Sequence, residues 1–264
     1  MSNIKLFVQR NPLVTFSVLA FALSWWPWLL SAANPFYPLF PLGPMVAALI
    51  LTVVANGRAG LKALLARAVQ WRVNLRWYGV VLFLPVALGL SASALNLLLG
   101  APLPVTAQWL PWQAILPTLL VQLLFIQVGE EFGWRGFALP RLLEGRSALT
   151  ASLILGLLWT AWHLPAYVTG TIAVILIPFP FVSSFLFTWL YQHTNGSVLI
   201  AILFHSWINT VAAVFFPLFS GPFFEQMLWL FVGVHVLAAA AVVVIAGRNL
   251  RRQPAPPLGV APTI

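Results

Sequence analysis

Long apolar segments fill most of this chain and leave it few ways to fold. Of its 264 residues, 61% are hydrophobic and 6% are charged, whereas a soluble domain carries about 25% charged residues. So little polar surface cannot cover a soluble core, and a run of ~20 apolar residues is long enough to cross a bilayer as a helix. The sequence therefore predicts an all-α fold, a polytopic membrane helix bundle of about eight transmembrane helices at residues 13–31, 38–56, 77–99, 112–131, 148–167, 171–191, 197–216 and 226–246.

The basic residues predict how this bundle is oriented. All thirteen Lys and Arg residues fall before the first segment, after the last, or in the second and fourth connections. Cytoplasmic connections are enriched in Lys and Arg, so we predict that both termini are cytoplasmic. The net charge of +9 is then a consequence of topology and of attraction to anionic lipid. It does not predict nucleic-acid binding, because the charges are divided among separate loops.

The same pattern gives the domain organisation. We expect a cytoplasmic N-terminus at residues 1–12, one membrane domain at 13–246, and a Pro-rich, disordered cytoplasmic tail at 247–264. The expected partner of every span is the lipid bilayer. We expect a multi-pass protein of the bacterial plasma membrane.

Two adjacent glutamates interrupt the fourth apolar segment. The chain has four acidic residues and no Asp, so Glu130 and Glu131 carry half of its negative charge. An ionised carboxylate inside a bilayer costs roughly 3 kcal/mol, and groups with this cost are usually kept for function. Arg135 shares a helix face with Glu131, and that pair is either a structural clamp or part of a site. Glu130 has no second basic partner nearby in the sequence and is the stronger candidate for chemistry.

Two further polar pairs occur at helical spacing. Trp159 and His163 lie four residues apart in the fifth segment, so the indole can pack on the imidazole. His205 and Asn209 lie four residues apart in the seventh segment and share a face in the same way. Each pair alone has a simpler explanation, either a histidine satisfied in the core or polar side chains that hold helices together.

Taken together, these side chains could hydrolyse an amide bond. Glu130 and His163 can bind a water molecule and remove its proton, while His205 and Asn209 can donate to the oxyanion of a tetrahedral intermediate. Alternatively, Glu130, His163 and His205 could hold Zn²⁺ with water in the open position, so the site has either no cofactor or zinc. The chain has no Asp for an aspartyl protease, no Cys nucleophile, and neither an H-E-x-x-H nor a G-x-S-x-G motif.

The order of the motifs, E-E-x-x-x-R, then aromatic-x-x-x-H, then H-x-x-x-N, resembles the CPBP family of intramembrane proteases. That family includes CAAX prenyl endopeptidases of the Ras-converting type and Abi-like proteins of bacteriocin processing or immunity. The resemblance implies an intramembrane endopeptidase, glutamate-type or metal-dependent, with its core at about 112–216. Its substrate would be a peptide or protein, with or without a lipid group. The resemblance implies that Glu130, His163, His205 and Asn209 are catalytic and that Glu131, Arg135 and Trp159 support them.

Trp159 departs from the family pattern, in which the second motif usually begins with Phe, but it keeps the aromatic packing role. Two other functions use the same residues. The chain could be a non-catalytic membrane scaffold or bacteriocin-immunity protein. It could also be a proton-coupled transporter with Glu130 in a relay, although no internal repeat of the usual transporter kind is visible.

The predicted helix bounds place Glu130 and His163 at different depths in the bilayer. We therefore expect that the helix bearing Glu130 continues past Arg135. We also expect that the site lies in a cavity open to the cytoplasm.

Overall fold

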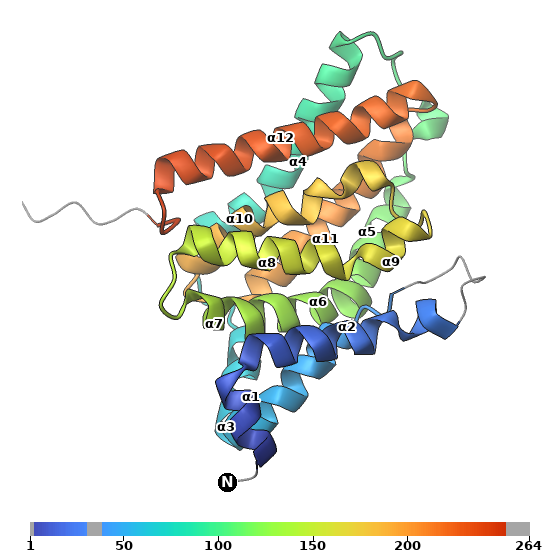
Figure 1. Ribbon diagram of the computed structural model, residues 1–264. Coiled ribbons are helices and arrows are strands. Elements are labelled where there is room, and N and C mark those ends of the chain that lie inside the picture. Colours follow the sequence, from blue (N-terminus) through green and yellow to red (C-terminus); the bar gives the residue numbers. More distant parts are fainter. Residues whose placement is uncertain (1–2, 31–38, 252–264) are drawn as a thin grey trace, which may run out of the picture.

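The computed structural model describes residues 3–30 and 39–251, in which all regular structure is helical (Figure 1). Seven helices in these ranges are long and apolar enough to cross a membrane. An eighth apolar helix, α8 (Ala148–Trp162), has 15 residues and corresponds to the predicted fifth segment. The predicted polytopic helix bundle is confirmed, while the orientation of its termini stays a prediction. Most of the predicted tail, residues 252–264, lies outside the described residues.

The elements follow the apolar segments and add short turns between them. The remaining helices are α1 (Asn3–Arg10), α2 (Pro12–Leu30), α3 (Gly43–Ala68), α4 (Arg76–Leu98), α5 (Trp112–Val121), α6 (Val128–Gly133), α7 (Leu139–Leu143), α9 (Leu164–Val168), α10 (Pro178–His193), α11 (Val198–Phe215) and α12 (Pro222–Ala246). Short 3-10 turns are η1 (Thr106–Gln108), η4 (Val174–Leu176) and η5 (Phe216–Leu218), and π-helical stretches are η2 (Gln122–Gln127) and η3 (Trp134–Ala138).

Helices α5, α6 and α7 form one span with the two π-helical stretches, from Trp112 to Leu143. The helix therefore continues past Arg135, as expected. Glu130 lies about 20 Å from the Leu143 end of this span, and His163 lies about 22 Å from the start of α8, at 1.5 Å per residue. Because α7 and α8 are joined by a short turn, the two residues reach the same depth.

Two glycines flank the glutamate pair and let α3 approach α6 closely. A Cβ atom added at Gly129 would lie 2.8 Å from Cα of Leu42, and one added at Gly133 would lie 2.8 Å from the carbonyl carbon of Pro44. Both distances are shorter than real Cβ contacts, so a larger residue at either position would push the start of α3 away. The glycines are four residues apart, the spacing with which small residues line helix contacts in membranes. This contact fixes the face of α6 that carries the glutamates.

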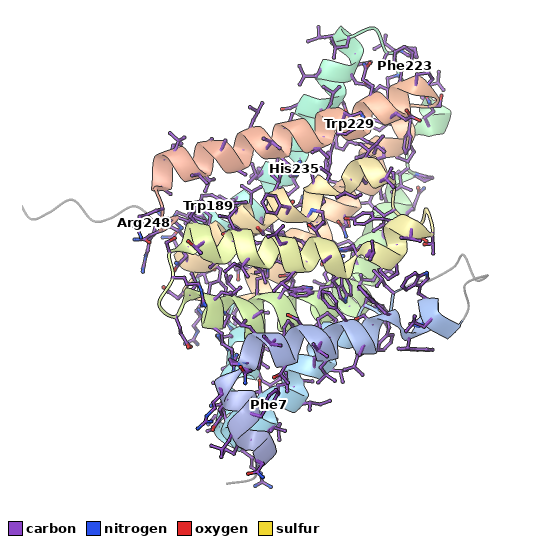
Figure 2. The ribbon with its side chains drawn as sticks, viewed as in Figure 1. Phe7, Trp189, Phe223, Trp229, His235 and Arg248 are labelled. Atoms are coloured by element: carbon purple, nitrogen blue, oxygen red, sulfur yellow. The ribbon has the colours of Figure 1, made fainter. Side chains whose placement is uncertain are left out.

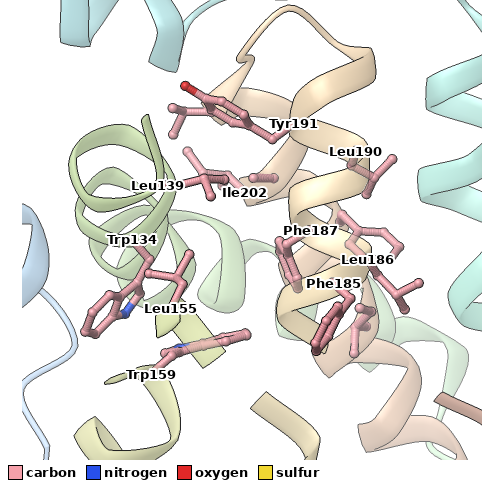
Figure 3. Packing of buried hydrophobic residues seen from close by; sticks show 14 of the residues in the cluster. Trp134, Leu139, Leu155, Trp159, Phe185, Leu186, Phe187, Leu190, Tyr191 and Ile202 are labelled. Atoms are coloured by element: carbon pink, nitrogen blue, oxygen red, sulfur yellow. The ribbon is translucent and has the colours of Figure 1, made fainter. Parts of the chain in front are cut away.

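The other contacts place α6 at the centre of the bundle. Figure 1 shows α4 and α12 on one side and α1, α2 and α3 on the other. Helices α8, α10 and α11 lie between them, with α8 packed on α10. Figure 3 shows the aromatic core of this region, where Trp159 of α8 meets Phe187 of α10 edge-to-face with ring centroids 5.5 Å apart. The glutamate pair is therefore enclosed by buried aromatic rings.

Candidate active site

The four side chains predicted to be catalytic line one cavity of about 410 Å³. Glu130 comes from α6, His163 from the end of α8, and His205 and Asn209 from α11. Residues up to 79 positions apart in the chain thus face one space, as the joint reading of the three motifs predicts. Glu131 and Arg135 lie behind this group, outside the cavity lining.

Glu130 is held by a tryptophan of the neighbouring helix. Its side chain is 4% exposed, and its Oε2 accepts a hydrogen bond of 2.8 Å from Nε1 of Trp159. Trp159 also lies beside His163, with ring centroids 5.9 Å apart, so the predicted packing contact is present. The bond to Glu130 was not predicted, and a Phe at this position could not make it.

His163 has a defined tautomer when it is neutral. Its Nδ1 lies 2.8 Å from the backbone oxygen of Trp159, and a carbonyl oxygen can only accept. Nδ1 therefore carries the proton, and Nε2 is left with a lone pair for the cavity. The rings of Trp162 and Tyr167 lie near the imidazole, with centroids at 4.8 Å and 6.1 Å from its own. His163 is positioned as an acceptor for a water proton.

Glu131 connects two other members of the site. Its Oε1 lies 2.8 Å from Nη1 of Arg135 and 2.7 Å from Nδ1 of His205. All three side chains are buried. The predicted ion pair between Glu131 and Arg135 is present. The guanidinium also lies over the rings of Trp159 and Phe187, 4.1 Å and 3.9 Å from their centroids, contacts that stabilise a desolvated cation.

Two glutamines complete the site and were missed in the sequence. Oε1 of Gln122 accepts hydrogen bonds from Nε2 of Gln127 at 2.8 Å and from Nδ2 of Asn209 at 3.3 Å. Both glutamines also line the cavity. In the sequence, the only clue to them is that two glutamines lie five residues apart in an apolar segment. In an α-helix, residues at this spacing lie on different faces. The π-helical stretch η2 brings them together.

A zinc site formed by Glu130, His163 and His205 does not fit this geometry. In the described part of the chain, no group of three or more metal-binding side chains is placed to hold an ion. Oε2 of Glu130 is engaged by Trp159, and Nδ1 of His205 is engaged by Glu131. These bonds leave Oε1 of Glu130 and Nε2 of both histidines free, so the misfit lies in the spacing of the three side chains and not in their partners.

The described lining of the cavity contains no Lys or Arg residue, and the cavity extends toward α9 and η4, where its lining includes Thr171 and Leu176; Thr171 is exposed. At the other end of the site, the buried side chains of Trp134, Phe137 and Leu142 close the bundle at η3 and α7. The expectation that the cavity opens to the cytoplasm stays a prediction.

Carboxylate, imidazole and amide groups thus meet at one cavity in a helical membrane bundle, and comparison with known proteins finds a protease family over the same residues. Residues 111–211, which contain all seven predicted site residues, match the family described as type II CAAX prenyl endopeptidase, Rce1-like. This match agrees with the resemblance of the motif order to the CPBP family of membrane proteases, and it covers less than half of the chain. CAAX prenyl protease 2 of Methanococcus maripaludis is 32% identical over 102 residues, which are 34% of this chain and 38% of that protein. The matched region thus spans less than half the length of this curated relative.

Proposed function

We propose that this protein is an intramembrane endopeptidase that hydrolyses a peptide bond with a water molecule activated by Glu130 and His163. The observation that supports it most strongly is the convergence of Glu130, His163, His205 and Asn209 on one cavity. The family match over residues 111–211 supports the same reaction class. The plasma membrane of a bacterium remains the proposed location.

In this mechanism Glu130 is the general base. The carboxylate takes one proton from the water, whose oxygen attacks the carbonyl carbon of the scissile bond. Nε2 of His163 accepts the second hydrogen of the water in a hydrogen bond and so orients the attack. When the tetrahedral intermediate collapses, the C–N bond breaks and Glu130 returns its proton to the leaving amine. The bond from Trp159 keeps the Glu130 carboxylate in place through both transfers.

His205 and Asn209 would stabilise the oxyanion. Because Glu131 accepts from Nδ1 of His205, Nε2 is the nitrogen left for the cavity. An Nε2–H group of His205 would donate to the oxyanion from there. The Asn209 amide has two hydrogens, of which Gln122 accepts one, so the second can serve the oxyanion.

The lining of the cavity suits an extended peptide that carries apolar side chains or a lipid group. Three buried polar atoms of its lining residues have no hydrogen-bond partner in the described part of the chain: the Tyr167 hydroxyl, Nε1 of Trp162 and Oε1 of Gln127. Such atoms are costly unless something bonds them, and the amides of a bound peptide offer both donors and acceptors. The rest of the lining is mainly apolar, including Ile208 and Phe231. Apolar side chains or a lipid group on the substrate would pack there.

Cleavage of a broad peptide library, free and farnesylated, by the purified protein in detergent tests this proposal. Removing the base in Glu130→Gln should reduce cleavage by more than about a thousandfold, and removing an oxyanion donor in His205→Ala by about a hundredfold. Glu144→Gln is the matched control, because Glu144 is an exposed glutamate outside the cavity. Cleavage by Glu130→Gln at the wild-type rate would contradict the mechanism. Binding of a peptide without cleavage would support the scaffold function instead.

A further inference from the structure

A groove lies away from the candidate active site, where α4 begins and α10 and α12 end. It has a volume of about 680 Å³, and its lining includes Arg76, Trp77, Trp189, His193, Ile245 and Arg251. Figure 2 marks this end of the molecule with Trp189 and Arg248. No residue of this groove belongs to the proposed catalytic machinery.

The groove carries positive charge that the protein does not neutralise. Arg76 and Arg251 are exposed, and neither forms an ion pair within the described residues. None of the four acidic residues of the chain lines the groove. The guanidinium of Arg76 lies 5.0 Å from the ring centroid of Trp77, an interaction that positions the cation without cancelling its charge. The N-terminus of α4, which has no acidic residue in its first turn, adds its partial positive charge.

A buried hydrogen-bond donor lies in the same groove. Trp77 is 5% exposed, and its Nε1 is buried without an acceptor among residues 3–30 and 39–251. The ring of His193 lies against that of Trp77, with centroids 4.9 Å apart. Nδ1 of His193 donates to the backbone oxygen of Trp189 at 2.9 Å, so the imidazole is held in place. An acceptor from outside the chain would satisfy Trp77.

The wall formed by α12 and α4 is apolar. Ile245 is 66% exposed, and Val80 lines the groove beside it. These residues lie at the ends of membrane-spanning helices, where the headgroup and acyl regions of a lipid meet. An anion with attached hydrocarbon matches both walls, whereas a free anion would leave Ile245 and Val80 uncovered.

We propose that this Arg76–Arg251 groove binds an anionic phospholipid. The phosphodiester would accept charge-assisted hydrogen bonds from Arg76 and Arg251 and one from Nε1 of Trp77. The acyl chains would run along Ile245 and Val80. All thirteen basic residues fall on one predicted side of the bundle, and basic pockets between helices on that side are suited to lipid headgroups.

The test titrates the purified full chain in neutral detergent with phosphatidylglycerol and, separately, with phosphatidylcholine of the same acyl chains. Native mass spectrometry counts the bound lipid. Phosphatidylglycerol should bind more tightly, and Arg76→Gln and Arg251→Gln should each weaken it about fivefold. Trp77→Phe, which keeps the ring and removes the N–H, should weaken it as well. Arg10→Gln removes the same charge from an exposed position on α1 and should leave binding unchanged.

Three results would overturn the proposal. Equal affinity for the two lipids would show that the groove does not recognise the anionic headgroup. An equal loss in Arg10→Gln would indicate attraction by net charge alone. Displacement of phosphatidylglycerol by inorganic phosphate at similar concentration would identify a site for the free anion. The unfolding temperature of each variant in phosphatidylcholine separates a folding defect from lost binding.

Discussion

Oε1 of Glu131 lies 2.7 Å from Nδ1 of His205, which joins the glutamate pair of α6 to the histidine of α11. The same oxygen bonds Arg135. One buried carboxylate thus orients a site histidine and compensates a buried cation. The two adjacent glutamates therefore differ in their surroundings. Glu130 lines the cavity, whereas Glu131 lies behind it and bonds His205 and Arg135.

Removing the charge of Glu131 should destabilise the fold as well as the reaction. Glu131→Gln leaves Arg135 buried without its hydrogen-bonded counter-charge, and breaking such a pair costs about 3–5 kcal/mol. Arg135→Met should have a cost of similar size. The double variant should be less destabilised than the sum of the two, because neither charge is then left unpaired. Thermal unfolding in detergent measures all three, and strictly additive losses would show that the two residues are not coupled.

Trp159→Phe should lower kcat/KM by at least about tenfold, because a hydrogen bond to a charged group contributes about 1.5–3 kcal/mol. The substitution keeps an aromatic ring beside Arg135 and His163 but removes the donor to Glu130. Trp134→Phe is the matched control. Trp134 is also buried but lies outside the cavity lining, and its Nε1 has no partner within the described residues. Equal losses in the two variants would show that only packing matters.

Gln122→Leu should reduce kcat roughly threefold to tenfold, the range expected for one interhelical hydrogen bond in a membrane. KM should change little, because the lost bond orients Asn209 toward the transition state. Gln127→Leu leaves the bond between Gln122 and Asn209 intact and provides the comparison. A larger effect of Gln127→Leu on kcat would argue against Gln122 as the positioning residue.

Chelation should leave cleavage unchanged, since the described side chains do not converge on a metal position. The measurement compares rates before and after prolonged dialysis against a strong chelator, together with the metal content of the protein. Loss of activity with a chelator and recovery with Zn²⁺ would restore the zinc mechanism, and the three ligands would then have to come closer together than they are here.

Single cysteines can determine the orientation of the bundle, because the natural chain has none. Glu144 and Thr106 are exposed at opposite ends of the α5–α7 span. With the predicted orientation, a membrane-impermeant maleimide added to intact spheroplasts should label Thr106→Cys and not Glu144→Cys. Permeabilised cells should give labelling of both. The reverse pattern would place the basic loops outside the cell.

The sequence was sufficient for features that depend on spacing along one helix. Apolar length predicted the membrane spans, and the four-residue separation of Glu131 and Arg135 predicted their ion pair. The bond between Trp159 and Glu130 could not be predicted in this way, because it depends on how α8 packs against α6. The pairing of Gln122 with Gln127 depends on a π-helical stretch, which no periodicity in the sequence predicts.

The direction in which the cavity extends could not be predicted from the sequence. It depends on which end of the bundle is closed by buried aromatic side chains. In the sequence, Trp134 and Phe137 do not stand out from the apolar residues around them. In the structure, both belong to η3 and are buried in the core. Their packing, rather than the positions of the charged loops, determines the direction in which the cavity extends.

The π-helical stretches on either side of Glu130 also determine how this span responds to the deletion of one residue. Each contains more residues per turn than an α-helix, so η2 or η3 could lose one residue and still leave a helix of nearly the same length. Such a deletion would convert the wide turn into an α-helical one and keep the two sides of the span in nearly the same rotational relation. A deletion inside α6 has no wide turn to absorb it, so it would rotate one side of the span by about 100° relative to the other and separate the glutamates from Trp159 and His205.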